Sequence, residues 1–234
     1  MKNIVELKNV TKAYGEGEHR LLAADGINFR IEEGEFVVIL GPSGAGKSTV
    51  LNLLGGMDFA TSGEIIINGR NITGYDDDQL TEYRAENVGF VFQFYNLIPT
   101  LTALENVELT RSVVKHALDA KEILQSVGLG DHFDQFPSQL SGGEQQRVSI
   151  ARAICKNPAM LLCDEPTGAL DSETGAVILA LLQQMSQEKN KTVIIVTHNT
   201  ALAQAADKVI KIKNGRIREI IQNERPIAVS EVNW

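Results

Sequence analysis

The sequence predicts an α/β protein built on a mostly parallel sheet. Short apolar runs rich in β-branched residues alternate along the chain with segments of helical periodicity, an arrangement typical of parallel strands connected by helices. These runs also end in glycine or polar residues, as strands do when their carboxyl ends form a binding edge. The runs expected to form this sheet are 35–40, 88–92, 160–163 and 192–196.

The front of the chain predicts a second, largely antiparallel sheet. Residues 3–10 alternate between polar and apolar side chains, as a half-exposed strand does, and 27–31 and 64–67 are further short strands. We expect Glu33-Gly34 to form a hairpin-like turn into the next strand, which opens the parallel sheet.

Helices are expected in the middle of the chain and near its end. Asp76-Asp77-Asp78 is predicted to start a helix, because an aspartate caps a helix well and acidic residues suit its first turn; a metal site at this triple is the weaker alternative. The pattern over 102–127 is helical but breaks near Lys115-His116. Residues 173–188 carry apolar side chains on one helical face.

The composition is that of an acidic globular protein. The 234 residues carry a formal net charge of −8, which disfavours a sequence-independent grip on nucleic acid, so we predict no nucleic-acid partner. No apolar run reaches the ~20 residues that cross a bilayer, and the N-terminus lacks the apolar block of a signal peptide. Cys155 and Cys163 are expected to be buried, reduced thiols, which favours a cytoplasmic location.

The strongest local motif follows the run 35–40. It fits G-x-x-x-x-G-K-S/T between a strand and a helix, the context of the phosphate-binding loop of nucleotide hydrolases. Glycines let backbone N–H groups converge on an anion, and the helix adds its own N–H groups. Lys47 is predicted to bridge the β- and γ-phosphates and Ser48 to bind Mg²⁺; a glycine-rich turn with a surface lysine is the alternative. The loop consists of Gly41, Pro42, Ser43, Gly44, Ala45, Gly46, Lys47, Ser48 and Thr49.

Two adjacent carboxylates follow the run 160–163. Asp164 is predicted to hold Mg²⁺, through water, opposite the Ser48 hydroxyl. Glu165 is predicted to accept a proton from the water that attacks the γ-phosphate. Adjacent acids before Pro166 also suit the start of a turn, which is the alternative. Several residues follow strand ends and are expected to share one edge: Gly41, Gln93, Asp164, Glu165 and His198.

A third motif carries a resemblance to a known family. Leu140-Ser141-Gly142-Gly143-Glu144-Gln145-Gln146 matches the signature sequence of ATP-binding cassette (ABC) ATPases. The other motifs, with Gln93, Ala169-Leu170-Asp171 and His198, occur in the family's order and spacing. Essentially the whole chain therefore resembles the ATPase subunit of an ABC transporter. Residues 76–109 resemble a narrower branch, which includes the lipoprotein-release, macrolide-export and FtsE-like ATPases.

The resemblance implies the ABC ATPase form of the P-loop NTPase fold. Its RecA-like, mostly parallel sheet is joined by an N-terminal antiparallel β subdomain and by an inserted helical subdomain at roughly 94–156. One domain would span 1–221. Residues 222–234 would be a C-terminal tail without an assigned role, either a flexible end or a segment that docks Trp234 on a neighbour.

The resemblance also implies roles for single residues. Tyr14 would stack on adenine, although alone it suggests a packing residue. Gln93 would sense Mg²⁺ and the attacking water. Without the resemblance, a single glutamine would be interpreted as an ordinary surface residue. His198 would touch the γ-phosphate, although a histidine ending an apolar strand is otherwise often a core polar group. Asp171 would lie near a seam between two copies of the chain.

The signature residues imply a dimer. Ser141 caps a helix that two glycines open, which makes an anion site without an anion of its own. In the family this group completes the ATP site of a second copy, so two chains would pack head to tail and close on ATP. The residues concerned are Ser141, Gly142, Gly143 and Glu144.

The chain is therefore expected to be an Mg²⁺-dependent ATPase that drives a separate integral membrane permease, FtsX-like by resemblance, from the inner face of the cell membrane. The apolar loop 94–101 either receives a cytoplasmic helix of that permease or packs into the helical subdomain. The cargo would be a lipoprotein, an antimicrobial peptide or a macrolide-like drug. An FtsE-like motor that moves no cargo and a soluble, non-transport ABC ATPase are the alternatives. A kinase or GTPase would leave 140–146 unexplained.

Overall fold

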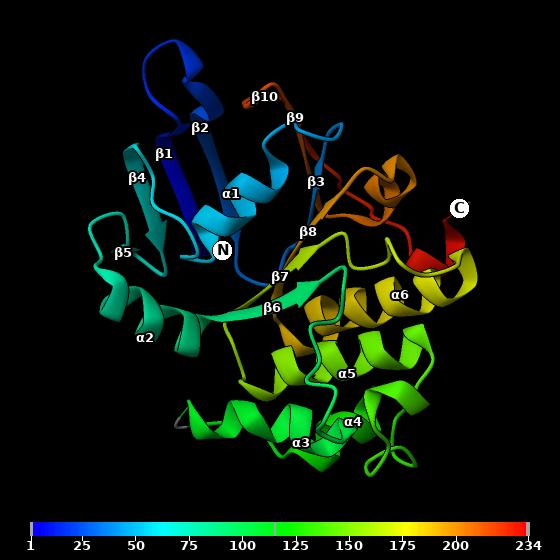
Figure 1. Cartoon of the computed structure of the whole chain (residues 1–234). Helices are drawn as coiled ribbons and strands as arrows, with labels where there is room; N and C mark the ends of the chain where they lie inside the picture. Colours follow the sequence, from blue (N-terminus) through cyan, green and yellow to red (C-terminus); the bar gives the residue numbers. More distant parts are fainter. Residues whose placement is uncertain (1, 115, 233–234) are drawn as a thin grey trace.

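The computed structural model describes residues 2–114 and 116–232. Its strands form two separate sheets, with helices packed between and beside them (Figure 1). The helices are α1 (Lys47–Leu54), α2 (Asp77–Asn87), α3 (Ala103–Glu108), α4 (Ala120–Ser126), α5 (Gly142–Cys155) and α6 (Ser172–Lys189). Short 3₁₀ segments are η1 (Gly17–His19), η2 (Leu109–Ser112), η3 (Pro137–Gln139), η4 (Thr200–Ala205) and η5 (Val229–Glu231).

The smaller sheet is antiparallel, as expected. Its strands are β1 (Asn3–Tyr14), β2 (Leu21–Glu32), β4 (Ser62–Ile67) and β5 (Arg70–Asn71), in the order β2-β1-β4-β5. The first two strands are longer than the patterns at 3–10 and 27–31 indicated. The two strands pair with each other as far as Tyr14 and Leu21. Cross-strand hydrogen bonds therefore extend each strand beyond its alternating segment.

The larger sheet confirms the predicted parallel core. Its strands are β3 (Phe36–Leu40), β6 (Val88–Phe92), β7 (Met160–Asp164), β8 (Thr192–Thr197), β9 (Lys208–Lys213) and β10 (Arg216–Gln222). Their order is β10-β9-β3-β8-β7-β6, and the neighbours are parallel except for β9 and β10, which are antiparallel.

The prediction of a hairpin-like turn at Glu33-Gly34 is wrong. β2 pairs with β1, whereas β3 pairs with β8 and β9, so this turn carries the chain from one sheet to the other. A buried ion pair secures the crossing, because Glu35 Oε2 lies 2.6 Å from Lys208 Nζ and also accepts a hydrogen bond from the Glu32 backbone N–H.

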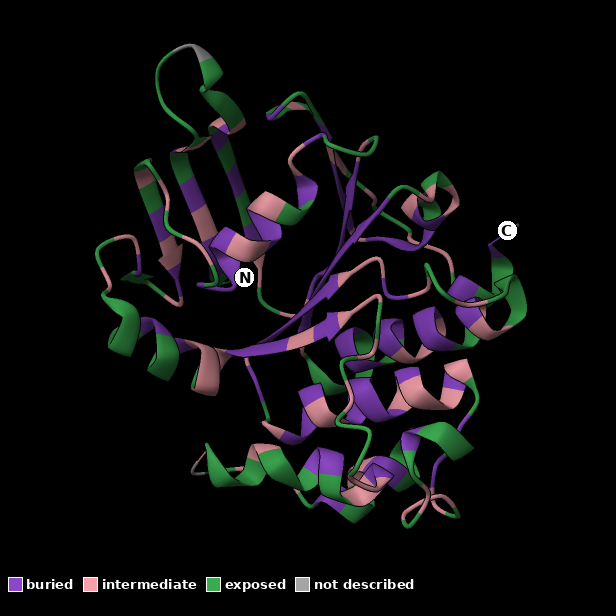
Figure 2. Ribbon diagram, in the orientation of Figure 1, coloured by how far each residue is buried: buried purple, intermediate pink, exposed green. Residues whose placement is uncertain are grey.

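The hydrophobic core lies on both faces of the larger sheet, which Figure 2 shows as a buried central layer. Successive residues of β3 alternate between the faces, as a period of two requires. Val37 and Ile39 pack with α1 and the antiparallel sheet, whereas Val38 packs with α5 and α6. A third cluster joins α3, α4 and α5. Both cysteines are buried and free, as expected.

The predicted tail 222–234 is ordered where the structure describes it. Gln222 ends β10, and Val229 and Val232 are buried in the core beside α6. The Gln183 side chain donates to the Ile227 carbonyl and accepts from the Val229 N–H. The prediction that Trp234 docks on a neighbour concerns a residue outside the described ones. The same holds for Lys115 in the predicted helix break. Among the described residues, none of the helices has both the length and the apolar composition that a membrane span requires.

Candidate nucleotide-binding site

The phosphate loop connects β3 to α1 and is held by close backbone contacts. A Cβ at Gly41 would overlap the carbonyl oxygen of Ile212, and a Cβ at Gly46 would overlap that of Ala23. Gly46 also caps α1 with a φ of 98°, in the left-handed region that favours glycine. The Ala45 carbonyl accepts a hydrogen bond from the Gly215 N–H. The glycines are therefore required by the packing of the loop, and the neighbouring strands brace its shape.

Lys47 is nearly buried inside this loop. It is the first residue of α1, and its ammonium group donates to the Pro42 carbonyl oxygen at 3.1 Å. An anion that enters the loop meets this cation together with the free N–H groups of the helix start.

Tyr14 borders a pocket of about 530 Å³ on one side of the loop. Tyr14 is 41% exposed, so its ring is accessible to a flat ligand. The pocket is lined by Tyr14, Leu21, Leu22, Ala23, Gly44, Ala45, Gly46, Lys47, Ser48, Thr49, Asn214 and Gly215. This arrangement is compatible with a base against Tyr14 and phosphates in the loop.

A second pocket of about 420 Å³ lies on the other side of the loop and joins residues from three strand ends. Ser48 Oγ donates to Asp164 Oδ1 at 3.2 Å within it. The lining residues are Ser43, Gly44, Lys47, Ser48, Phe92, Gln93, Phe94, Asn96, Asp164 and Glu165. The sequence-based expectation that Gln93, Asp164 and Glu165 share an edge with the phosphate loop is thus met in space.

The pKa of Asp164 is raised, mainly because its partial burial disfavours the charged form. The neighbouring Glu165 raises it further, while the hydrogen bond from Ser48 and the Lys47 cation act in the opposite direction. A cation beside Asp164 would relieve this destabilisation of the carboxylate.

This donor set fits Mg²⁺ better than a metal held by protein alone. The described residues contain no group of three or more His, Cys, Asp or Glu side chains placed to hold a metal ion. Mg²⁺ at nucleotide sites takes few protein oxygens and completes its shell with phosphates and water. Ser48 Oγ and Asp164 Oδ1 are such a pair, with the Gln93 side chain lining the same pocket.

Glu165 is held by the end of β8. Its Oε1 lies 3.0 Å from Nδ1 of His198, and its Oε2 accepts a hydrogen bond of 2.9 Å from the Thr197 hydroxyl. Its backbone N–H donates to the Val196 carbonyl, and its φ of 46° lies in the left-handed region. Two residues that were predicted separately to lie at this edge, Glu165 and His198, are therefore in contact. Thr197 was not singled out from the sequence, which contains no local signal for this long-range contact.

The signature residues form a helix N-terminus, as predicted. Ser141 caps α5, and a reciprocal capping box links it to Glu144. Gly143 approaches Thr174 so closely that an added Cβ would overlap the Thr174 methyl group. Asp171 caps α6, accepts from the Thr174 N–H and is exposed.

Neither pocket at the phosphate loop includes the signature residues or Asp171. Asp171 instead lines a separate pocket of about 250 Å³ with Glu165 and His198. The two pockets at the phosphate loop are therefore lined without Ser141–Glu144 or Asp171.

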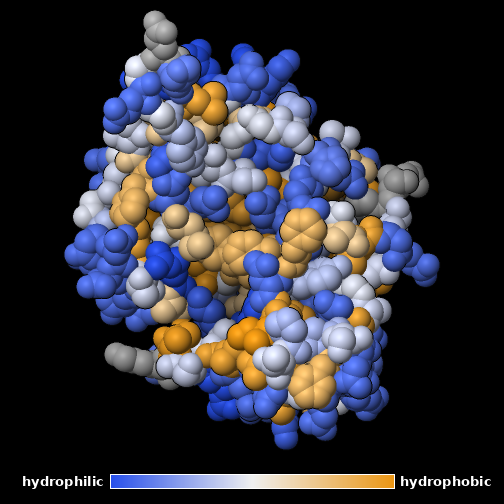
Figure 3. Space-filling view, viewed as in Figure 1, coloured by the Kyte–Doolittle hydropathy of each residue, from blue (hydrophilic) through white to orange (hydrophobic). Residues whose placement is uncertain are grey.

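The apolar loop after Gln93 is packed at one residue and exposed at others. Leu97 packs against the α3–α5 cluster, whereas Phe94 is 72% exposed and Ile98 is also exposed. The guanidinium of Arg152, on α5, donates to the Tyr95 and Asn96 carbonyls and ties the loop to that helix. Figure 3 shows apolar surface gathered on one face of the molecule amid polar surroundings.

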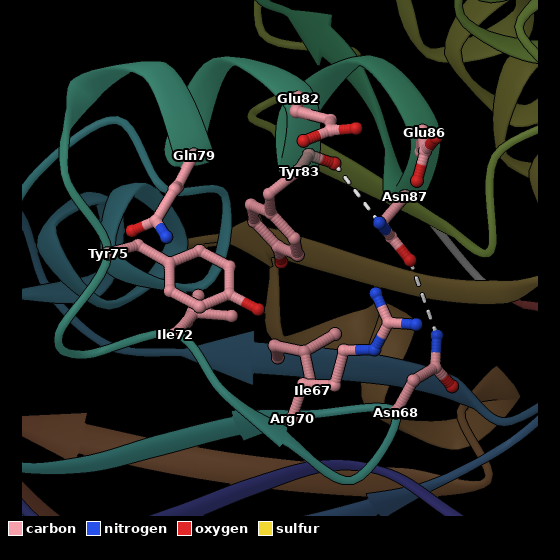
Figure 4. Close-up of a pocket in the computed structure, with 10 residues that line it drawn as sticks. All are labelled: Ile67, Asn68, Arg70, Ile72, Tyr75, Gln79, Glu82, Tyr83, Glu86 and Asn87. Carbon is pink, nitrogen blue, oxygen red and sulfur yellow. Dashed lines mark hydrogen bonds between the residues drawn. The ribbon is translucent and has the colours of Figure 1, made fainter.

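A further pocket lies between α2 and the turn that joins β4 to β5 (Figure 4). Arg70 points into it toward Asn87, and Tyr75 and Glu82 lie around it. Asn68 Nδ2 contacts Asn87 Oδ1 at 3.4 Å across one end. The predicted site residues do not line this pocket, so it is separate from the nucleotide edge.

Comparison with known proteins identifies the family. Residues 24–168 match the family model of the ABC transporter. An uncharacterized ABC transporter ATP-binding protein of Methanocaldococcus jannaschii is 48% identical over 223 residues, which cover 93% of this chain and 99% of that protein. The macrolide export ATP-binding/permease protein MacB of Aggregatibacter actinomycetemcomitans is 44% identical over 92% of this chain and 34% of its own length.

Solved structures agree with this assignment. The ATP-binding cassette MJ0796, in a dimeric post-hydrolysis state bound to ADP and Pi, superposes with a TM-score of 0.85 at 45% identity, covering 93% of this chain and 98% of that one. MJ0796 is a protein of the same organism, Methanocaldococcus jannaschii. The confirmed fold, the family model and these relatives together show that the chain belongs to the ABC transporter family, as an ATP-binding subunit of the ABC ATPase class.

Proposed function

We propose that this chain is the Mg²⁺-dependent motor of an ABC transporter, binding and hydrolysing ATP to move a separate membrane permease. The observation that carries the proposal is the shared pocket of Lys47, Ser48, Asp164 and Glu165, with His198 in contact with Glu165. A phosphate cradle, an oxygen pair suited to a cation and a carboxylate base are the parts that phosphoryl transfer to water needs.

Each residue has a chemical task in this proposal. Tyr14 stacks on the adenine, and the backbone of the loop with Lys47 binds the phosphates. Ser48, Asp164 and Gln93 would hold Mg²⁺, which supplies charge neutralisation on the phosphates when bound. Glu165 accepts a proton from the attacking water while the γ-phosphate is transferred, and His198 orients that carboxylate.

The motor works as a head-to-tail dimer in this proposal. The signature residues Ser141–Glu144 do not line the pockets at their own phosphate loop, so a second copy would supply them to complete each ATP site. The helices between roughly 94 and 156 would form the inserted subdomain that carries them. The dimeric state of the MJ0796 cassette, bound to ADP and Pi, supports a dimer by similarity. ATP would favour the closed dimer, and hydrolysis would release it.

The partner is proposed to be an FtsX-like permease, with the motor on the cytoplasmic face of the membrane. The resemblance of 76–109 to the lipoprotein-release and macrolide-export branch and the similarity to MacB support it. The exposed Phe94 and Ile98 beside Gln93 offer a surface for a helix of that permease. A lipoprotein, an antimicrobial peptide or a macrolide-like drug is the proposed cargo, with FtsE-like force transmission as the alternative.

The decisive experiment replaces the catalytic base, Glu165. Glu165→Gln should bind ATP and accumulate as a dimer in size-exclusion chromatography while steady-state phosphate release falls by about 10² or more. Glu224→Gln, the same change at an exposed position, is the control and should behave as wild type. Wild-type turnover by Glu165→Gln, or a monomer with Mg-ATP both alone and with the permease, would overturn the proposal.

The partner class is tested by purification from cells. A tagged chain should recover a membrane protein in detergent, and mutation of Ile98 to serine should reduce that recovery without lowering the basal ATPase rate. Recovery of ribosomes or nucleic acid in place of a membrane protein would favour a non-transport ATPase.

A further inference from the structure

Both carboxylate oxygens of Glu165 are held by consecutive residues at the end of β8. Thr197 is the last residue of this strand, and His198 follows it directly. The Thr197 hydroxyl donates to Oε2 at 2.9 Å, and His198 Nδ1 lies 3.0 Å from Oε1. The two contacts differ in surroundings, because Thr197 is only 5% exposed whereas the His198 side chain is 72% exposed.

The Thr197 hydroxyl has its direction set by a third residue. The backbone N–H of Asn199 donates to Thr197 Oγ1 at 3.1 Å. A hydroxyl group has one proton to donate, and here its oxygen already accepts a bond. The proton is therefore directed to Glu165 Oε2, and the hydrogen-bond chain runs in one direction, from the Asn199 N–H through Thr197 to the carboxylate.

The backbone of Glu165 depends on the same strand. Its N–H donates to the Val196 carbonyl, and its φ of 46° is unusual for a side chain of this size. Strand β8 thus fixes the backbone of Glu165, and the Thr197 hydroxyl fixes the position of its carboxylate. Without the hydroxyl, the exposed His198 would be the remaining hydrogen-bond partner of the carboxylate among the described residues.

We propose that Thr197 is a positioning residue for the catalytic base of this ATPase. It touches neither nucleotide nor water in this role and acts only by fixing the Glu165 carboxylate. The inference rests on the proposed function, in which Glu165 accepts the proton of the attacking water. A misplaced base should slow the chemical step and leave nucleotide binding intact.

The test compares three substitutions by steady-state ATPase kinetics. Thr197→Val keeps the shape and removes the hydroxyl, and its kcat should fall by about tenfold to a hundredfold while KM for ATP stays within about twofold. Thr197→Ser restores the hydroxyl and should recover most of kcat. Thr192→Val is the matched control, since Thr192 is a buried threonine at the opposite end of β8 whose hydroxyl accepts from the Gly34 N–H.

A double variant separates positioning from a general loss of structure. If Thr197 acts through Glu165, then Thr197→Val should slow Glu165→Gln no further, because its target is already gone. Unfolding by urea and ATP-dependent dimerisation of Thr197→Val should match those of Thr192→Val.

The outcomes distinguish this inference from the proposed function. An unchanged kcat in Thr197→Val beside a slow Glu165→Gln overturns the positioning role alone. Failure of Thr197→Ser to recover activity, an equal loss in Thr192→Val, or a further loss in the double variant also overturns it. Wild-type turnover by Glu165→Gln overturns the base assignment, and the positioning role falls with it.

Discussion

The hydroxyl of Tyr14 donates a hydrogen bond of 2.6 Å to Oδ2 of Asp58. Lys12 Nζ lies 2.5 Å from the other Asp58 oxygen and 4.8 Å from the centroid of the Tyr14 ring. The ring is therefore held from its polar end and by a cation over it, and a ligand that stacks on it meets a surface already ordered.

Asp58→Ala should weaken ATP binding because it frees the Tyr14 ring. We expect KM for ATP to rise by about threefold to tenfold with little change in kcat, since the ring contacts the base and not the reacting atoms. Tyr14→Ala should raise KM at least as much. The double variant should be no worse than Tyr14→Ala, and an additive loss would contradict the idea that Asp58 acts through the ring.

Gly143→Ala should destabilise the fold by about 1–3 kcal/mol, because the new methyl group overlaps the methyl of Thr174 and helices α5 and α6 must separate. Thr174→Ser removes that methyl but keeps the hydroxyl that donates to Asp171 Oδ2. The double variant should therefore recover most of the free energy of unfolding measured in urea. If stability did not recover, the destabilisation by Gly143→Ala would not come from contact with the Thr174 methyl group.

Stability should depend on pH through Lys156. Its ammonium group donates to the carbonyls of Arg84 and Val88, and burial, with a smaller effect of the Arg84 cation, lowers its pKa to about 8. Since the pKa of free lysine is about 10.4, the unfolded chain binds more protons between these pH values, and stability rises with pH across that window.

The comparison with Lys156→Met isolates this effect. The free energy of unfolding of the wild type, minus that of the variant, should increase from about pH 8 to about pH 10 and stay flat below about pH 7. Urea titrations at fixed ionic strength measure it. A difference that falls with rising pH would contradict the lowered pKa.

Gln183→Leu should release the C-terminal segment. The Gln183 side chain donates to the Ala205 and Ile227 carbonyls and accepts from the Val229 N–H, and these bonds are buried or partly buried. Leaving these groups without partners should cost about 2–5 kcal/mol in urea unfolding and expose residues after 222 to protease. Gln184→Leu, one residue along and exposed, should change neither.

Much of the architecture follows from local signals. The run before Gly41 predicts β3, Asp76 and Ser141 predict the starts of two helices, and all three are present. Each of these elements depends on residues within a few positions of one another, so it can be predicted from the local sequence. The prediction of a hairpin at Glu33-Gly34 is wrong because β3 pairs with β8 and β9, which come from near the end of the chain.

The candidate site shows the same division. Lys47, Ser48 and Asp164 are predictable because a motif or a strand end identifies them. Thr197, Asp58 and Lys12 matter through contacts made across the fold, and their residue types are unremarkable in their local sequence. Such partners can be identified only from the folded structure, in which distant segments of the chain are in contact.

The strand order also has a consequence for synthesis. β3, which leads into the phosphate loop, is flanked by β8 and β9, both encoded in roughly the last fifth of the chain. A nascent chain on the ribosome therefore exposes this apolar strand, unpaired on both sides, until translation is nearly complete. A product that terminates before Thr192 would retain the glycine-rich motif yet lack the frame that shapes it into a nucleotide cradle.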